Sequence, residues 1–399
     1  MSSTDSFAAS SEASASSASA AVLESPSDIA VQKPAQNTTK SIDEILFTRC
    51  PVPTATGIAY NLGWLGEHFK PDGINIATIQ DSPALWRHHY DHDVPHLIRE
   101  GGNVLALAAR AQGAPTRLIG LTWIEEGQAI LVRPGSGITE PGHLKGRRLA
   151  LPTYVHNSIP SHVRGTSISR AMSLHGYKGA LAFAGLTFDD VDFVEVDGGN
   201  WDRPSATPPD RNGSASPAAG VRARGWWALT ALLECKVDAV YVKGAAAADA
   251  ARLHGAIVGI DLDRLPNRRF RVNNGTPRPI TVHENLLRHH PDIVTRFLVQ
   301  TLRAADWAAG HLPELQQILQ AETSGSGEGV AAAYREGFHL TLHPDLSDER
   351  LELLEQQKKF LWLQGFQDFD FSLRDWVARA PLDAAYALRE ELRKGGRWL

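Results

Sequence analysis

Residues 222–242, RARGWWALTALLECKVDAVYV, decide the fold class of this chain. Apolar residues with helical spacing fill the first part, and the last part is a short apolar run rich in β-branched residues. The stretch therefore predicts a helix that leads directly into a buried strand. Upstream, residues 138–152, ITEPGHLKGRRLALP, predict a short helix, a turn and a buried strand, and a helix at 167–177 precedes a strand at 191–197. Strands that alternate with helices in this way indicate an α/β fold with mostly parallel strands.

The flanking sequence continues the alternation on both sides. Residues 73–80, GINIATIQ, alternate apolar and polar side chains as a half-buried strand does. Pro291 marks a break or a new start within a long helical stretch, and Ser347 is a good N-cap for a helix that follows it. The Gly-, Pro- and Ser-rich residues 198–220 predict a loop. Further strands are expected at 41–48, 116–124, 127–134 and 255–262, and further helices at 57–69, after the glycine pair of 96–113, at 283–312 and at 347–366.

Composition points to an ordinary globular protein. Of the 399 residues, 43% are hydrophobic and 21% charged, and the formal net charge is -5. This charge gives no electrostatic footprint for nucleic acid or for an anionic membrane. Residues 1–40 are rich in Ser and Ala and predict a disordered tail without the pattern of a secretory signal. We therefore expect a cytoplasmic monomer with no membrane span.

The chain has two cysteines, which rules out a disulfide framework, and it lacks a Cys-x-x-Cys metal pair. Cys50 lies in the proline-stiffened stretch RCPVP, and its residue type leaves four roles open: buried filler, half of a disulfide, metal ligand or nucleophile. A bridge to Cys235 is not expected in a cytosolic protein. Cys235 lies where the predicted helix meets the strand, and we expect it to be structural.

A histidine-rich stretch, residues 88–102, HHYDHDVPHLIREGG, carries the second set of candidate site residues. His88, His92 and His96 recur every four residues, which on one helix would resemble a metal site. Pro95 argues against a continuous helix there, so a polar loop is the favoured interpretation and no dedicated metal is expected.

The same stretch ends in a possible anion site. The guanidinium of Arg99 is a planar fork suited to carboxylate, sulfinate or sulfonate oxygens. Gly101 and Gly102 let backbone amides approach such an anion, and a helix that begins after them adds its positive end. A surface arginine before a helix start is the alternative.

Three stretches together resemble the two-lobed solute-binding proteins for alkanesulfonates and thiamine precursors: HLKGRRLALP, CKVDAVYVKG and LLRHHPDIVTRFLVQTLRAADWA. The resemblance implies two α/β lobes joined by two crossings of the chain, with a ligand cleft between them. Lobe I would comprise residues 41–125 and 243–399, and lobe II residues 126–242.

A more specific resemblance rests on RCPVP and HHYDHDVPHLIREGG, which are similar to motifs of the 2'-hydroxybiphenyl-2-sulfinate desulfinase family. The register implies Cys50 as nucleophile, His89 as its histidine, Arg99 as sulfinate-binding residue and Gly102 as backbone donor beside Gly101. A slip of one residue would select His88 instead. The family's chemistry is the release of sulfite from an aromatic sulfinate without a cofactor.

Two other functions remain open on this fold. One is a non-catalytic binding protein that delivers an organic sulfonate or a similar anion to an ABC transporter. The other, a pyrimidine-precursor synthase, would need a cofactor-linked lysine and a cysteine-rich motif, which RCPVP does not supply. Within the desulfinase hypothesis, Arg49 adds positive charge, and the small residues and single lysine of YVKGAAAADAA, residues 241–251, would widen or repolarise the cleft wall. The ring system of the substrate is therefore left open.

Overall fold

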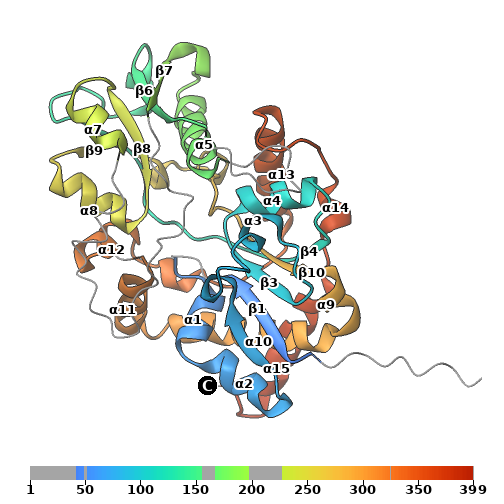
Figure 1. Cartoon of the computed structure of the whole chain (residues 1–399). Helices are drawn as coiled ribbons and strands as arrows, with labels where there is room; N and C mark the ends of the chain where they lie inside the picture. The colour runs from blue at the N-terminus through green and yellow to red at the C-terminus, as the bar shows by residue number, and fades with distance from the viewer. Residues whose placement is uncertain (1–41, 49–51, 155–166, 197–226, 324, 399) are drawn as a thin grey trace, which may run out of the picture. The chain divides into compact units, whose positions relative to one another are not determined.

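The computed structural model describes residues 42–48, 52–154, 167–196, 227–323 and 325–398 (Figure 1). They form two β-sheets with helices packed around them. Cys50 with its neighbours Arg49 and Pro51, the predicted N-terminal tail and the predicted loop at 198–220 lie outside the described residues. No helix in the described ranges is both long and apolar enough to cross a membrane.

The first sheet has the strand order β2-β1-β3-β10-β4. Strand β1 is parallel to β2 and β3, whereas β10 is antiparallel to β3 and β4. The sheet is mixed because β10 returns from the second sheet and enters from the opposite end. Strand β3 was not predicted from the sequence, and its four residues, LIRE, are all buried although two of them are charged. The bounds are β1 Glu44–Thr48, β2 Asn75–Thr78, β3 Leu97–Glu100, β4 Thr116–Thr122 and β10 Arg278–His283.

Helices from distant parts of the chain pack together beside the first sheet, with α1 against α10 and α10 against α15. Gly63 takes a left-handed conformation (φ 78°) and divides the single helix predicted at 57–69 into α1 and α2. Pro291 begins α10, where its missing N–H is not needed, and Ser347 caps α13 as predicted. The bounds are α1 Ala55–Asn61, α2 Trp64–Phe69, α3 His88–Asp91, α4 Asn103–Ala111, α9 Glu284–His289, α10 Pro291–Ala308, α11 Leu312–Thr323, α12 Gly327–Ala333, α13 Asp348–Leu363, α14 Leu373–Trp376 and α15 Ala380–Lys394.

The second sheet has the order β7-β6-β8-β5-β9. Strand β6 is parallel to β7 and β8, and β5 is antiparallel to β8 and β9. Strand β9 pairs with β5 and so belongs to the second sheet, although it lies within residues 243–399, which the sequence placed in lobe I. The chain returns to the first sheet with β10. The bounds are β5 Gln128–Val132, β6 Arg148–Pro152, α5 Ile168–Phe183, β7 Asp192–Val196, α7 Trp227–Leu233, β8 Ala239–Lys243, α8 Ala245–Leu253 and β9 Ile257–Asp261.

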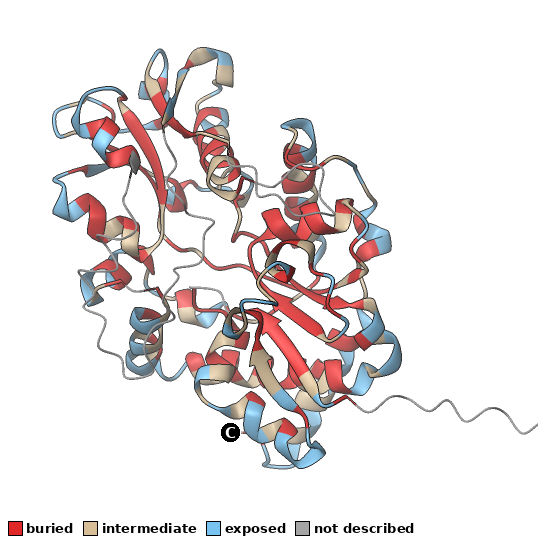
Figure 2. Cartoon of the chain, in the orientation of Figure 1, coloured by how far each residue is buried: buried red, intermediate tan, exposed pale blue. Residues whose placement is uncertain are grey.

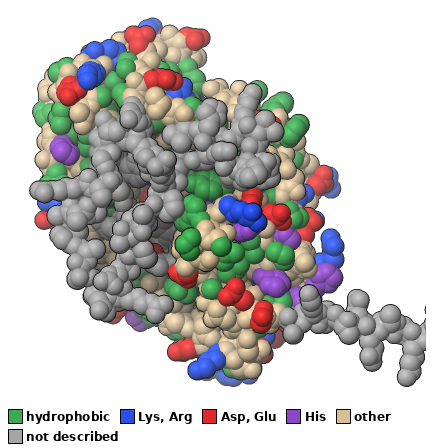
Figure 3. All heavy atoms as spheres, in the orientation of Figure 1, with side chains coloured by type: hydrophobic (Ala, Val, Ile, Leu, Met, Phe, Trp, Pro, Cys, Tyr) green, Lys and Arg blue, Asp and Glu red, His purple; other side chains and the backbone are tan. Residues whose placement is uncertain are grey.

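The chain passes between the two sheets twice. We call residues 123–127, between β4 and β5, the first crossing, and residues 262–277, between β9 and β10, the second crossing. Most strands of both sheets are largely buried, whereas β2, β7 and β9 are more exposed (Figure 2). The largest apolar cluster lies around the first sheet, and two smaller ones lie around the second. On the face shown in Figure 3, side chains of both charges are interspersed, as the small net charge predicts. The predicted two-lobed α/β fold is present.

Candidate active site

The parallel strands β1 and β3 bring the two candidate motifs toward one edge of the first sheet. Thr48, the last residue of β1, pairs with Arg99 of β3. Parallel strands have their carboxyl ends at the same edge, so the segments after Thr48 and after Glu100 start there together. The described residues resume at Val52, which is buried, as is Thr54, which caps α1.

Arg99 is folded against the glycine pair that follows it. Its side chain is buried, and Nη1 donates a hydrogen bond to the carbonyl oxygen of Gly102 at 3.1 Å. A Cβ on Gly101 would lie 2.6 Å from Cζ of Arg99, so no larger residue fits at this position without moving the guanidinium. We refer to Arg99, Gly101 and Gly102 together as the anion motif.

The anion motif leads directly into helix α4, whose N-cap is Gly102. Gly101 N donates to Pro279 O at 3.2 Å, and Asn103 N donates to Asn274 O at 2.7 Å. For the Gly102 amide between them, the described part of the chain offers no acceptor. A helix N-terminus carries partial positive charge, so this amide and the helix favour an anion at the same place.

His89 lies beside the anion motif and is held by aromatic rings. Its ring stacks on Trp86 with centroids 5.3 Å apart and meets Tyr90 edge-on at 5.2 Å. Burial, and to a smaller extent the nearby charge of Arg99, lower the pKa of His89 to about 3. His89 is therefore neutral at ordinary pH, and its buried Nδ1 meets no hydrogen-bond partner in the described residues.

His88 occupies a different environment from His89. Nδ1 of His88 lies 2.8 Å from Asp91 Oδ1, and Nε2 accepts a hydrogen bond from Arg87 Nε at 3.2 Å. Both ring nitrogens of His88 thus have partners on neighbouring side chains. Of the two histidines that the register leaves open, His88 is held by Asp91 and Arg87, whereas His89 lies beside Arg99.

The predicted interruption of the histidine-rich stretch is present. Helix α3 ends at Asp91, and His92 takes a left-handed conformation (φ 53°), before Pro95 is reached. His88, His92 and His96 therefore do not share one continuous helix. Within the described residues, no group of three His, Cys, Asp or Glu side chains has the arrangement of a metal site.

Glu100 is a buried acid that the sequence analysis did not single out. It accepts hydrogen bonds from Thr56 N at 3.1 Å and from Thr122 Oγ1 at 3.0 Å. Burial raises its pKa, while the hydrogen bonds and the charge of Arg278 oppose that shift. Glu100 thereby ties β3, which carries Arg99, to the start of α1 and to β4.

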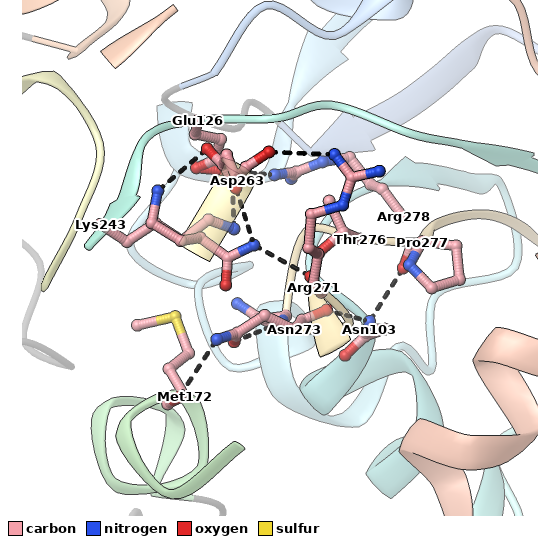
Figure 4. A network of polar contacts seen from close by, with 12 residues as sticks. Asn103, Glu126, Met172, Lys243, Asp263, Arg271, Asn273, Thr276, Pro277 and Arg278 are labelled. Atoms are coloured by element: carbon pink, nitrogen blue, oxygen red, sulfur yellow. Dashed lines mark hydrogen bonds and ion pairs between the residues drawn. The ribbon is translucent and has the colours of Figure 1, made fainter. Parts of the chain in front are cut away.

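Three charged side chains meet where the crossings join the sheets, and we call Glu126, Lys243 and Arg278 the charge cluster. Glu126 Oε1 lies 3.1 Å from Lys243 Nζ and 2.7 Å from Arg278 Nη2. The two cations approach Glu126 from either side (Figure 4). A Cβ on Gly275 would lie within 2.8 Å of all three groups, which explains a glycine at this position. Their separation in sequence left no signal by which the cluster could be predicted.

The stretch after β8 differs from the open cleft wall that we expected. Lys243 is engaged by Glu126, and Ala245, Ala247 and Ala250 are buried. These alanines let α8 pack closely on α12, where Asp249 accepts a hydrogen bond from Ser326 N at 2.7 Å. The small residues therefore serve helix packing.

Cys235, which we expect to be structural, lies at the surface. It is exposed and takes a left-handed conformation (φ 60°) just after α7. The conformation ends the helix, a position at which glycine is usual. Any thiol chemistry assigned to Cys50 therefore has to be separated experimentally from this accessible second thiol.

The chain is similar to enzymes that act on an aromatic sulfinate. It is 26% identical over 362 residues to the 2'-hydroxybiphenyl-2-sulfinate desulfinases of Rhodococcus erythropolis and Rhodococcus qingshengii, covering 84% of this chain and 92% of each relative. The predicted resemblance is confirmed. No protein-family model matches the chain.

Solved structures show the same fold. The desulfurization enzyme DSZB aligns with a TM-score of 0.64 at 23% identity, covering 87% of this chain and 99% of that one. A mutant of DSZB in complex with biphenyl-2-sulfinic acid aligns with the same TM-score. The periplasmic aliphatic sulphonate binding protein SsuA from Escherichia coli aligns with a TM-score of 0.57 at 15% identity, covering 85% and 93%. The chain therefore has the two-lobed fold that the sequence predicted.

Proposed function

We propose that this protein is a cofactor-independent desulfinase that cleaves the carbon–sulfur bond of an aromatic sulfinate and releases sulfite. The observation that carries the proposal is the pairing of Thr48 with Arg99. Cys50 follows Thr48 by two residues, a length of chain that spans at most about 7 Å. This connectivity supports a thiol beside the anion motif, and the similarity to the desulfinases supports the reaction.

The anion motif would hold the sulfinate group. The Arg99 guanidinium offers charged donors, and the Gly102 amide at the positive end of α4 offers a neutral one. Both types of donor bind oxygen atoms that carry negative charge, and they act most strongly when they are fixed before the substrate arrives. The contact of Gly101 with Arg99 supplies this fixation.

Cys50 would carry the chemical step by one of two routes. In the first, the thiol donates its proton to the ring carbon that bears sulfur, and the carbon–sulfur electron pair stays with the ring as sulfur dioxide leaves. Water then adds to the sulfur dioxide to give hydrogen sulfite and a proton, which restores the thiol. In the second, the Cys50 thiolate attacks sulfur, and the ring leaves with the bond pair and a proton. Water then hydrolyses the sulfur–sulfur bond. In both routes, the water oxygen ends in sulfite, so the enzyme is a hydrolase.

His89 would act as a neutral imidazole. Its lowered pKa excludes a permanent positive charge beside Arg99, and the stacking on Trp86 fixes the ring plane. A neutral ring can donate through one nitrogen and accept through the other. It can therefore orient either a sulfinate oxygen or the Cys50 thiol without competing for the anion's charge.

A sulfonate-binding protein of the transporter type is the competing function, because SsuA has the same fold. Sulfite release from benzenesulfinate and biphenyl-2-sulfinate separates the two functions. We expect turnover by the wild type, loss of turnover with retained binding in Cys50→Ser, and weakened binding in Arg99→Gln. Cys235→Ser serves as the matched control and should leave turnover unchanged. Binding of these anions by the wild type without any sulfite release would show a binding protein.

A further inference from the structure

The second crossing reaches the anion motif through Asn274. The N-cap of helix α4 is Gly102, which has no side chain to cap the helix, and the capping oxygen comes from Asn274 instead. Val104 N donates to Asn274 Oδ1 at 3.0 Å, and Asn103 N donates to Asn274 O at 2.7 Å. A residue more than 150 positions away in the chain thus takes the place of the usual N-cap side chain.

This hydrogen bond also fixes which way the Asn274 amide points. Because a backbone N–H can only donate, the atom facing Val104 must be the oxygen, and the amino group Nδ2 occupies the other position. A Cβ on Gly102 would lie 2.4 Å from both Oδ1 and Nδ2, so the amide plane lies directly against the Gly102 backbone. In the described part of the chain, Nδ2 has no acceptor.

Asn274 is held in place from the second sheet. Its backbone N donates to Asn273 Oδ1 at 2.6 Å. The side-chain amide of Asn273 in turn donates to Tyr241 Oη at 2.5 Å and to Met172 O at 3.2 Å. Figure 4 shows Asn273 between Met172 and Asn103, which donates to the Asn273 carbonyl at 2.7 Å. The Asn274 donor is therefore fixed before any ligand binds.

We propose that Asn274 is a further substrate-binding residue of the sulfinate site, with Oδ1 capping α4 and Nδ2 donating to a sulfinate oxygen. The inference rests on the proposed function, since it assumes that the anion motif binds the sulfinate. A sulfinate has two oxygens, each of which accepts more than one hydrogen bond. Arg99, the Gly102 amide and Asn274 Nδ2 supply donors from β3, the start of α4 and the second crossing.

Asn274→Asp separates donation from capping. The variant keeps an oxygen for Val104 N, but it replaces the Nδ2 donor with a second carboxylate oxygen that repels an anion. We expect the dissociation constant for benzenesulfinate, measured by calorimetry, to rise about tenfold or more, because hydrogen bonds to charged groups contribute that much. The thermal midpoint should stay close to that of the wild type.

Asn267→Asp is the matched control, since it makes the same change in the same crossing. The Asn267 side chain accepts a hydrogen bond from Arg269 N at 3.0 Å and is exposed. We expect its benzenesulfinate affinity to remain within about twofold of the wild type, which removes a general charge effect as the explanation. Asn274→Ala, which loses both the cap and the donor, should lower both the affinity and the thermal midpoint.

Wild-type affinity in Asn274→Asp would overturn the inference while leaving the desulfinase proposal intact. If that variant does not fold, wild-type affinity in Asn274→Ala overturns it equally. Failure of the proposed function looks different, because the wild type itself would then release no sulfite from either sulfinate.

Discussion

Lys243 Nζ lies 3.1 Å from Glu126 Oε1, and this contact joins the last residue of β8 to the first crossing. Glu126 also forms an ion pair with Arg278, the first residue of β10, so one carboxylate binds a cation from each sheet. Both cations are nearly inaccessible to water, with side-chain exposures of 7% for Lys243 and 3% for Arg278. The charge cluster therefore links a strand of each sheet to the first crossing through one carboxylate.

Glu126→Gln should destabilise the protein strongly. Removing the carboxylate leaves two buried cations facing each other, and the loss of one member of a buried ion pair costs about 3–5 kcal/mol. Urea unfolding measures this change in the free energy of unfolding. Glu234→Gln, which breaks the exposed contact between Glu234 and Lys236, is the control and should have little effect. Equal stabilities of the two variants would contradict the importance of the charge cluster.

His175→Phe should stabilise the protein, and most of all in acid. His175 is 1% exposed, both ring nitrogens lack partners in the described residues, and its ring lies 4.4 Å from that of Phe360. Burial, and then the charge of Lys178, hold its pKa well below the usual 6.5. Since the unfolded chain takes up a proton that the folded protein refuses, the unfolding free energy of the wild type falls as pH drops below about 6.5.

The phenylalanine variant lacks this proton uptake. Denaturant unfolding at pH 7.5 and at pH 5 should therefore show a larger gain in stability at pH 5. A gain that is independent of pH would mean that His175 is protonated to the same degree in the folded and the unfolded chain.

His89→Gln should lower the rate of sulfite release by about a hundredfold, the typical contribution of a positioned acid–base group. The pKa of His89 is lowered to about 3, so the ring is neutral throughout pH 5–8. The ratio of wild-type to variant kcat/KM should therefore be constant over this range. A ratio that falls toward pH 5 with a midpoint near 6.5 would show that His89 titrates normally and is not enclosed beside Arg99.

Gly101→Ala should weaken sulfinate binding more than it affects folding. The added Cβ would lie 2.6 Å from Cζ of Arg99 and would displace the guanidinium from the anion motif. We expect KM for benzenesulfinate to rise about tenfold or more, the effect of losing a charged hydrogen bond. Gly66→Ala is the control, because a Cβ there meets nothing within 4 Å, and it should leave KM unchanged. Equal KM values for the two variants would place the arginine elsewhere.

The sequence by itself determined the features that depend on neighbouring residues. Alternating apolar patterns predicted most strands and helices, Pro291 marked the start of α10, and Ser347 marked that of α13. The anion motif could be recognised because Arg99, Gly101 and Gly102 lie within four consecutive residues. Short-range steric and hydrogen-bonding preferences are sufficient for all of these.

The tertiary structure alone decided the features that join distant parts of the chain. The buried strand β3 includes Arg99 and Glu100, and its burial depends on pairing with β1 and β10 rather than on an apolar pattern. His89 lies beside Arg99 whereas His88 is bound to Asp91, and Glu126 meets Arg278 across 152 residues of sequence. Asn274, in the second crossing, likewise contacts Gly102 from a distant part of the chain. Such contacts form only when the two sheets and both crossings are assembled. The partner of a buried charge or of a free helix end is set by spatial proximity in the folded chain, and the local sequence does not encode it.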